Sequence, residues 1–303
     1  MGVINTGNFA KDMWPGVKTW WGQEYKEWQT EYTELFDKVM SDKLYEEYVG
    51  FSGMGLFKQK PEGEAIKYDS MQQGVVTRAT NVYYALGIII THEMMINDQY
   101  NLMKKRTQML AFKGRQTKEI VGANVFNRAF NSSYTFGDGQ PMLSASHTSK
   151  AGLWSNIIGT AADLSEASLE QAAIDIAGFK DDAGSFVSIM PRSLHIHRNE
   201  MFNAQRILKS IQQSGTANND INALKVLNIF PEGVAVNHYF TAPKAWFVRT
   251  NVKRETGLIY QEREADQFVM DTDSDTLNQK CLSYGAYAFT MADPRSVYGS
   301  AGT

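Results

Sequence analysis

The longest regular pattern of hydrophobic and polar positions lies between Ile88 and Phe130. It opens with three β-branched residues and continues without proline, and apolar or small side chains recur every three or four positions. From Asp98 onward the pattern predicts a helix of about 33 residues, roughly 50 Å long. Such a rod indicates either a flat subunit whose faces are covered by neighbouring copies, or a large α/β domain crossed by one helix. The recurring positions are Ile96, Tyr100, Met103, Thr107, Leu110, Gly114, Thr117, Val121 and Val125.

A second amphipathic pattern, rich in aromatic residues, covers residues 11–48. Its apolar positions follow helical spacing, which predicts one or two helices. Aromatic rings bury large apolar areas, so this segment is expected to dock either on its own body or on another subunit. Three of its tryptophans are candidate intersubunit contacts: Trp14, Trp21 and Trp28. The remaining apolar positions are Val17, Tyr25, Tyr32, Leu35 and Val39.

Residues 50–87 change character, because glycine and proline interrupt a pattern that alternates most regularly from Val76 to Tyr84. This pattern predicts a long β-hairpin with turns near Pro61 to Gly63 and near Ser70 to Gly74. An isolated two-stranded ribbon is marginally stable in water. The hairpin is therefore expected to fold over its own domain or to reach a neighbour. Its candidate contacts to acidic patches on an adjacent subunit are Lys58, Lys60, Lys67 and Arg78.

The rest of the chain mixes a few helices with mostly antiparallel strands, which predicts an α+β fold. Ser165 is a suitable N-cap for a helix that runs to about Phe179. Residues 200–213 read as a further helix, and residues 214–222 as a polar loop. Strands are predicted over residues 186–190, 194–197, 225–230, 234–238, 245–251, 258–263, 267–271 and 280–291.

Composition narrows the classes of protein to consider. Lys and Arg total 30 against 33 Asp and Glu, a formal net charge of −3 over 303 residues. This balance argues against tight nucleic-acid binding and is compatible with weak contact to packed DNA. The single cysteine, Cys281, excludes an internal disulfide. The longest apolar stretch, residues 85–90, is too short to cross a membrane, and no signal peptide is present, so we expect a soluble intracellular protein.

Two groups of residues suggest chemistry, and both are incomplete. His195 and His197 lie on one face of a predicted strand near Glu200, but no second cluster completes a tetrahedral metal site. Ser144 lies close to His147, as in some hydrolases, but no nucleophile-elbow motif surrounds the serine. We therefore predict no catalytic residue, no cofactor and no metal.

The order of the segments and several local motifs are similar to one family. The motifs are Thr-His-Glu at residues 91–93 before Asn-Asp-Gln-Tyr at 97–100, Phe-Asn-Arg-Ala-Phe at 126–130, Asp-Gly-Gln-Pro-Met-Leu-Ser at 138–144 with His147, and Asp-Pro-Arg-Ser-Val-Tyr-Gly at 293–299. With these motifs the chain resembles the major capsid proteins of tailed bacteriophages, which have the Hong Kong 97-type fold. The motifs are most similar to those of Mu-like major head subunits.

The resemblance implies how the chain divides into domains. It also implies which loop lies near a symmetry axis of the capsomer. That axis loop would contain Asn218, Asn219 and Asp220. Because no scaffolding segment precedes the arm, a separate scaffolding protein is implied. No motif assigns a covalent crosslink. The implied parts are an N-terminal arm (1–49), an E-loop (50–90), a P-domain (91–182) with a spine helix at about 98–130, an A-domain (183–265), and returning P-domain strands (266–303).

The implied function is structural. Pentamers and hexamers of the chain would form an icosahedral phage head around double-stranded DNA, assembled in the host bacterial cytoplasm without a membrane. The implied partners are other copies, a scaffolding protein, a portal, a decoration protein and weakly bound DNA. Two alternatives stay open at this point. One is an encapsulin-like cage for enzyme cargo, and the other is a metal-dependent enzyme centred on His195, His197 and Glu200.

Overall fold

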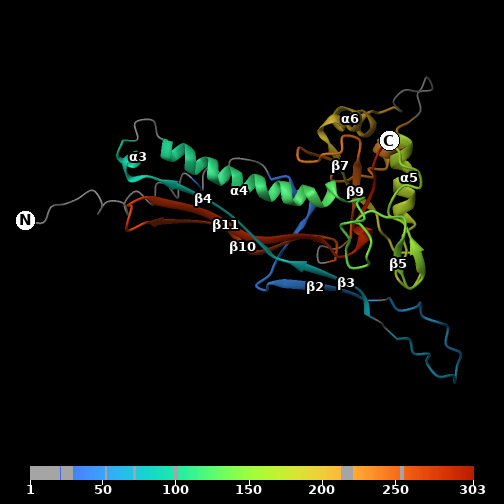
Figure 1. Cartoon of the computed structure of the whole chain (residues 1–303). Helices are drawn as coiled ribbons and strands as arrows, with labels where there is room; N and C mark the ends of the chain where they lie inside the picture. Colours follow the sequence, from blue (N-terminus) through green and yellow to red (C-terminus); the bar gives the residue numbers. More distant parts are fainter. Residues whose placement is uncertain are drawn as a thin grey trace, which may run out of the picture.

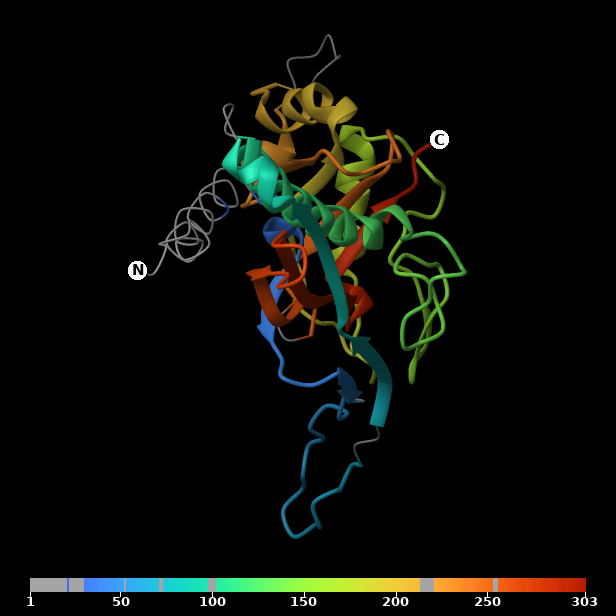
Figure 2. The same ribbon diagram turned by 60° about the vertical axis from the view of Figure 1, so that its left-hand side comes forward.

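The computed structural model describes residue 21 and residues 30–51, 53–70, 73–97, 102–212, 221–252 and 256–303. The molecule is elongated (Figure 1). The long helix α4 (Leu102–Asn127) lies along a narrow sheet, and a second sheet with its own helices lies at one end. A hairpin extends away from both, as the view in Figure 2 also shows.

The narrow sheet, called the body sheet below, has four strands in the order β1-β10-β11-β4. β1 runs parallel to β10, and the other pairs are antiparallel. β4 therefore belongs to this sheet although it lies in the range expected for the E-loop. The strands are β1 (Asp37–Met40), β10 (Leu258–Thr272), β11 (Gln279–Met291) and β4 (Val82–Ile90).

One face of the body sheet is covered by α4. Met103 and Leu110 pack on Ile90 and Cys281 near the start of the helix. Near its end, Phe126 joins a larger aromatic core. The helix predicted over residues 98–130 is thus present and ends at residue 127; residues 98–101 lie outside the described part of the chain.

A charged residue of α4 is buried inside this interface. Lys118 is 2% exposed, and its Nζ lies 3.0 Å from Asp266 Oδ2 and 3.9 Å from Glu262 Oε1. The ammonium group also lies over the rings of Tyr260 and Tyr287, 5.5 Å and 5.0 Å from their centroids. Lys118 thus has opposite charges and aromatic faces around it, the surroundings that a buried cation requires.

The second sheet has the order β12-β9-β7-β8 and lies between two apolar layers. On one face, Ile196 and Trp246 pack against Leu169 and Ile176 of α5. On the other face, Phe247 joins the core around the end of α4. The elements are β12 (Val297–Ser300), β9 (Trp246–Thr250), β7 (Pro191–His197), β8 (Val234–Asn237), α5 (Glu166–Ala177), α6 (Met201–Lys209) and α7 (Ala223–Val226).

Two separate hairpins and several short helices complete the fold. Ser165 caps α5 as predicted, because its side chain accepts the N–H of Ser168 at 3.1 Å. The remaining elements are β2 (Tyr45–Phe51), β3 (Gln73–Thr80), β5 (His147–Ser149), β6 (Gly152–Trp154), α2 (Tyr32–Leu35), α3 (His92–Ile96), η2 (Arg198–Glu200) and η3 (Pro294–Ser296).

Two predicted elements are wrong. The N-terminal helical pattern does not continue to residue 48, because α2 ends at Leu35 and residues 37–40 pair with β10. Residues 225–230 form no strand; α7 begins at Ala223, and the side chain of Asn222 accepts the N–H of Lys225. In both places a contact distant in sequence, or a capping side chain, outweighs the local pattern.

Two further predictions need adjustment. Residues 186–190 contribute a single bridge, between Lys180 and Phe186, where a strand was predicted. The strands predicted at 258–263 and 267–271 are one strand, β10, interrupted by bulges. The α+β class is confirmed. No helix of the described residues is both long and apolar enough to cross a membrane.

Candidate functional site

The loop between β2 and β3, residues 53–70, is called the projecting loop here. It extends away from the body of the molecule (Figures 1 and 2). It turns at Gly63, whose φ of +84° suits glycine, close to the predicted position. At its root the Asp69 carboxylate accepts the N–H of Gly55 at 2.8 Å, and this hydrogen bond lowers the pKa of Asp69. This hydrogen bond thus joins the two ends of the loop at its base, whereas the residues around Gly63 are exposed.

Large apolar side chains of the projecting loop are exposed to water. Phe57 and Tyr68 are 105% and 96% exposed, and Leu56 and Ile66 are also exposed. Soluble monomers rarely present such side chains together unless the surface binds something. The loop therefore has the properties of an interface segment.

The predicted basic contacts fall into two groups. Lys58, Lys60 and Lys67 lie on the projecting loop and are exposed. Arg78 lies on β3, and its guanidinium group donates to Glu47 of the same hairpin at 2.6 Å. Arg78 therefore already has an ion-pair partner in its own chain.

The predicted aromatic and axis contacts are only partly described. The ring of Trp21 stacks on Phe268 of its own chain, with 5.9 Å between the ring centroids. Trp14, Trp28 and the axis-loop residues Asn218, Asn219 and Asp220 lie outside the described residues.

The face of the body sheet opposite α4 carries a second exposed apolar group, called the open face. Val269 and Leu282 are direct neighbours across β10 and β11, and Leu282 neighbours Gly87 of β4. Directly paired residues point to the same side of a sheet, so Ile89, two residues after Gly87, shares this face. Ile89, Leu282 and Val269 are all exposed. Among the described residues no helix covers this side (Figure 1).

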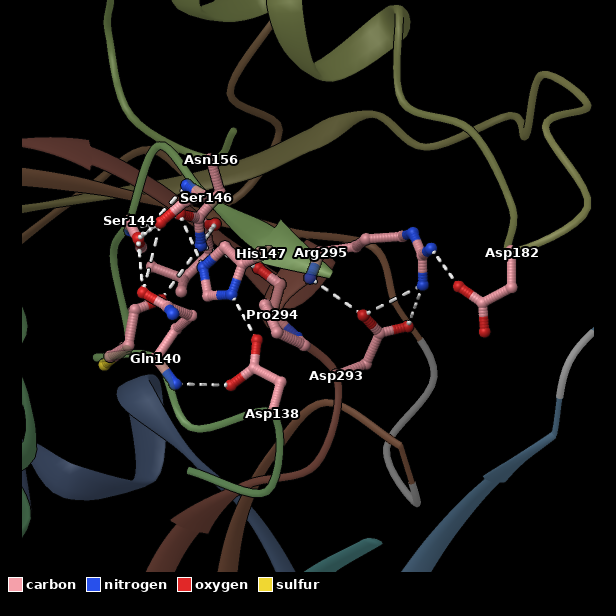
Figure 3. Close-up of polar contacts among 12 residues, drawn as sticks. Asp138, Gln140, Ser144, Ser146, His147, Asn156, Asp182, Asp293, Pro294 and Arg295 are labelled. Atoms are coloured by element: carbon pink, nitrogen blue, oxygen red, sulfur yellow. Dashed lines mark hydrogen bonds and ion pairs between the residues drawn. The ribbon is translucent and has the colours of Figure 1, made fainter. Parts of the chain in front are cut away.

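A buried polar cluster lies where the hairpin meets the body (Figure 3). His147 is fully buried; its Nδ1 lies 2.6 Å from Asp138 Oδ2 and its Nε2 lies 3.0 Å from Asn156 Oδ1. The backbone of this segment approaches β3 so closely that a Cβ on Gly137 would lie 2.3 Å from the Val76 carbonyl oxygen. The cluster therefore fixes this segment against the base of the hairpin.

Asn156 is the centre of the cluster. Its Nδ2 donates to the carbonyl oxygens of Met142 at 2.9 Å and Pro294 at 3.1 Å, and its Oδ1 accepts the N–H of Ser144 at 2.9 Å. These contacts fix the orientation of the amide. Because Oδ1 can only accept, Nε2 of His147 must be the donor in its bond to Asn156.

The serines of this segment do not form a catalytic pair with the histidine. The hydroxyl groups of Ser144 and Ser146 each donate to Gln140 Oε1 at 3.2 Å. Both ring nitrogens of His147 are engaged by Asp138 and Asn156. A hydrolase needs its base hydrogen-bonded to the nucleophile, so this geometry is structural.

We expect Asn156→Ala to lower the free energy of unfolding by about 3 kcal/mol, because it leaves buried carbonyl groups and the His147 ring without their partner. Urea unfolding of the purified subunit measures this. The control is Gln171→Ala, which removes an exposed amide bonded to Asp175 and should cost less than about 0.5 kcal/mol. A loss below about 1 kcal/mol for Asn156→Ala would contradict the role of this residue.

Next to the cluster, Arg295 lines a pocket of about 380 Å³ at the base of the hairpin. The guanidinium group donates to Asp182 at 2.6 Å and lies 3.4 Å from Asp293 (Figure 3). It also stands over the ring of Trp154. The third carboxylate of the pocket, Asp138, is paired with the histidine. All three carboxylates are thus held by cationic or hydrogen-bonding partners within the chain.

The candidate metal ligands do not converge. His195 is buried, and its Nε2 lies 2.8 Å from Ser193 Oγ. Burial, with the nearby charge of Arg249 second, lowers the pKa of His195 to about 3. His197 accepts a backbone N–H of the following turn, and Glu200 accepts a side-chain amide of α6. Within the described part of the chain, no three potential ligands gather in one place.

Comparison with known proteins agrees with this picture of a structural subunit. Among solved structures, the chain is similar to the virus-like particle from Pyrococcus furiosus, with 9% identity over 95% of this chain and 99% of the other and a TM-score of 0.55. A structure from Mycobacterium phage Che8 shares 12% identity over 92% of this chain and 94% of the other, with a TM-score of 0.56. The capsid of the empty GTA particle shares 10% identity over 89% of each chain, with a TM-score of 0.59. These similarities confirm the Hong Kong 97-type fold.

No protein of curated function matches the chain in sequence. A family model described as phage capsid protein matches residues 74–300, which is more than half of the chain. This match favours a phage head over an encapsulin-like cage and over a metal-dependent enzyme. The narrower similarity to Mu-like subunits stays a prediction. The chain belongs to the phage capsid protein family, and it is a major capsid protein.

Proposed function

We propose that copies of this chain form pentamers and hexamers that close into an icosahedral phage head around double-stranded DNA. The observation that carries this proposal is the projecting loop, whose Leu56, Phe57 and Tyr68 are exposed on a segment without a core of its own. Burying a large apolar side chain contributes about 1.5–3 kcal/mol. A second copy of the chain supplies the surface that covers them.

The open face of the body sheet is the proposed receiving surface. It presents Ile89, Leu282 and Val269, which are apolar, exposed and arranged on adjacent strands. The projecting loop and the open face are different surfaces of one chain. Each subunit therefore packs its loop on one neighbour and binds the loop of another neighbour on its open face. Such head-to-tail contacts generate closed rings when the rotation between neighbours closes, which is the symmetry of a capsomer.

Other parts of the chain extend this proposal. Trp14 and Trp28 of the N-terminal arm and Lys58, Lys60 and Lys67 bind adjacent subunits, and residues 218–220 lie near the capsomer axis. Trp21 instead packs on Phe268 of its own chain. The division into arm, E-loop, P-domain and A-domain follows the boundaries given above, except that β4 and all of β10 belong to the body sheet. A separate scaffolding protein, a portal and a decoration protein act in assembly, which takes place in the bacterial cytoplasm.

Weak contact with DNA is proposed for the solvent side of α4. Lys105, Arg106 and Lys113 are exposed there. The net charge of −3 for the whole chain hides this local excess of positive charge. Three phosphate contacts per subunit give weak, salt-sensitive binding without sequence preference, so packaged DNA can leave the head.

Electron microscopy of the expressed chain, with and without a co-expressed scaffolding protein, tests the proposed function. We expect rings, tubes or closed shells, and more regular shells when the scaffolding protein is present. Analytical ultracentrifugation checks that the particles account for most of the protein. A chain that stays monomeric under both conditions, although folded by circular dichroism, would exclude assembly as its function.

A further inference from the structure

The outer edge of β4 is an open strand edge of the body sheet. β4 (Val82–Ile90) is the last strand in the order β1-β10-β11-β4 and pairs only with β11. About half of the backbone N–H and C=O groups of an edge strand point away from its sheet. Within the described part of the chain, no turn or loop forms a backbone hydrogen bond with residues 82–90. These outward groups are therefore available to another strand.

The sequence of β4 does not protect this edge. Natural proteins guard sheet edges with charged side chains, proline or bulges, because an unguarded edge pairs with other chains. β4 contains no charged residue and no proline, and its register with β11 is unbroken. Most of its residues are β-branched or aromatic, which favours strands. Tyr83, Leu86 and Ile89 are each more than half exposed. The composition thus favours pairing across the edge.

The partner that best matches this edge is β4 of a second copy of the chain. A charged strand laid against β4 would lose water without gaining an opposite charge. Charged side chains occur on β1, β2, β3 and the outer half of β10. The remaining edge strands of the described chain, β5, β6, β8 and β12, are only three or four residues long. A second β4 is long, apolar and uncharged, so it leaves no charge unpaired.

We propose that β4 pairs with β4 of a second copy, antiparallel and about a twofold axis at Leu86, so that two body sheets join into one. This register places the two Leu86 side chains opposite each other. It also places Tyr83 opposite Ile89 of the other copy, once on each side of the axis. Aromatic and β-branched residues stabilise a sheet when they face each other on adjacent strands. Pairing over residues 83–89 adds about six to eight backbone hydrogen bonds.

The surroundings of β4 are compatible with this contact. Two cationic side chains lie beside the strand, and each has a contact in its own chain. Lys113 lines a cavity of about 100 Å³ beside Leu86, and its Nζ donates to Gln116 Oε1 at 2.8 Å. The guanidinium group of Arg263 lies over the ring of Tyr83, 5.6 Å from its centroid. Neither cation therefore needs the space that the second strand occupies.

The symmetry of the contact matters for the proposed shell, and this consequence rests on the proposed function. A contact between identical surfaces is closed and stops at two copies. The head-to-tail contacts of the projecting loop build rings, and a twofold contact links one ring to the next. The twofold axis is perpendicular to the joined sheet, so α4 of both copies lies on the same side. Both helices can therefore face the interior of one shell.

Disulfide crosslinking of the full-length chain tests the contact. Directly opposite residues of antiparallel strands have Cα atoms about 4.5–5.5 Å apart, which a disulfide can bridge. Leu86→Cys should therefore form a covalent dimer on mild oxidation, seen by denaturing electrophoresis without reducing agent. The control is Leu153→Cys, at an exposed leucine of β6, which should stay monomeric on the gel. The wild type, whose Cys281 is buried, should do the same.

Two further cysteine variants test the register. Tyr83→Cys and Ile89→Cys should each fail to crosslink alone, because equivalent positions lie about 20 Å apart across the axis. A mixture of the two variants, combined before oxidation, should crosslink. A Leu86→Cys chain that forms no more dimer than Leu153→Cys would overturn the proposal. So would crosslinking of Tyr83→Cys to itself, because it requires another register.

A charge substitution measures the strength of the contact. Leu86→Lys removes both leucines from the axis and places two like charges opposite each other. It should raise the dissociation constant of the dimer at least about 100-fold in analytical ultracentrifugation. Leu153→Lys is the matched control and should leave this constant unchanged. If Leu86→Lys does not fold by circular dichroism, the cysteine variants decide alone.

The outcomes separate this contact from the proposed function. Leu86 lies on the α4 side of the sheet, paired with Ser283, so its variants leave the open face intact. Crosslinked dimers without shells would support the β4 contact and contradict the proposed shell. Shells that form normally from Leu86→Lys would do the reverse. Impaired assembly of Leu86→Lys without crosslinking of Leu86→Cys would mean that another segment covers this edge, which also overturns the proposal.

Discussion

Replacing Leu56, Phe57 and Tyr68 together by serine should abolish shell formation while leaving the subunit folded. These side chains are exposed in the isolated chain, so their loss removes little from its own core. Each buried ring or branched chain contributes about 1.5–3 kcal/mol to a contact. The loss of three should raise the protein concentration needed for assembly at least about 100-fold. Light scattering against concentration, with electron microscopy of the products, measures this change.

A matched variant of the same loop separates apolar packing from charge. Replacing Lys58, Lys60 and Lys67 by glutamine leaves the apolar contact in place. It should weaken assembly less, and it should reduce the sensitivity of assembly to salt. Normal shells from the triple serine variant would show that the projecting loop is not an assembly contact. In that case the open face would need another occupant.

Lys118→Met should lower the free energy of unfolding by about 3–5 kcal/mol, because it leaves two buried carboxylates without their shared cation. Asp266 and Glu262 are both largely buried beside this lysine. Although burial favours the neutral acid, the hydrogen bond from Lys38 holds the pKa of Glu262 below its ordinary value. The charge therefore persists at neutral pH when the lysine is removed. Urea unfolding of the subunit measures the loss.

Two further variants make the interpretation of this loss specific. Lys113 lies on the exposed side of the same helix. Lys113→Met should therefore change the free energy of unfolding by less than about 0.5 kcal/mol. Adding Asp266→Asn to Lys118→Met should recover much of the stability, because it removes the carboxylate closest to the missing ammonium group, whereas Glu262 keeps its ion pair with Lys38. A loss below about 1 kcal/mol for Lys118→Met would mean that water or another cation replaces the lysine.

The parts of the fold that local pattern determines could be predicted. The long helix follows from its unbroken spacing of apolar positions, and the start of α5 follows from Ser165. The hairpin turn follows from the glycine and proline near residue 63. In each of these places neighbouring residues carry the information, so no knowledge of distant contacts is needed.

The parts that depend on distant partners could not be predicted. Residues 37–40 become a strand because they pair with β10, more than two hundred positions away in the sequence. His147 belongs to a recognisable motif, but its partner Asn156 follows no recognisable spacing. Glu119 is the clearest case, because nothing in the helical pattern distinguishes this buried carboxylate from an exposed one. Its partners are the N–H groups of Glu31 and Tyr32, which lie far away in the sequence.

The order of strands in the body sheet has a mechanical consequence for the hairpin. The chain enters the hairpin from β1, at one edge of the sheet, and leaves it into β4, at the opposite edge. The two ends of the hairpin are thus attached to opposite edges of the body sheet, and its tip projects away from the sheet. Sheets deform most readily by twisting. A small twist moves the two attached ends in opposite directions, and the length of the loop amplifies this movement at its tip.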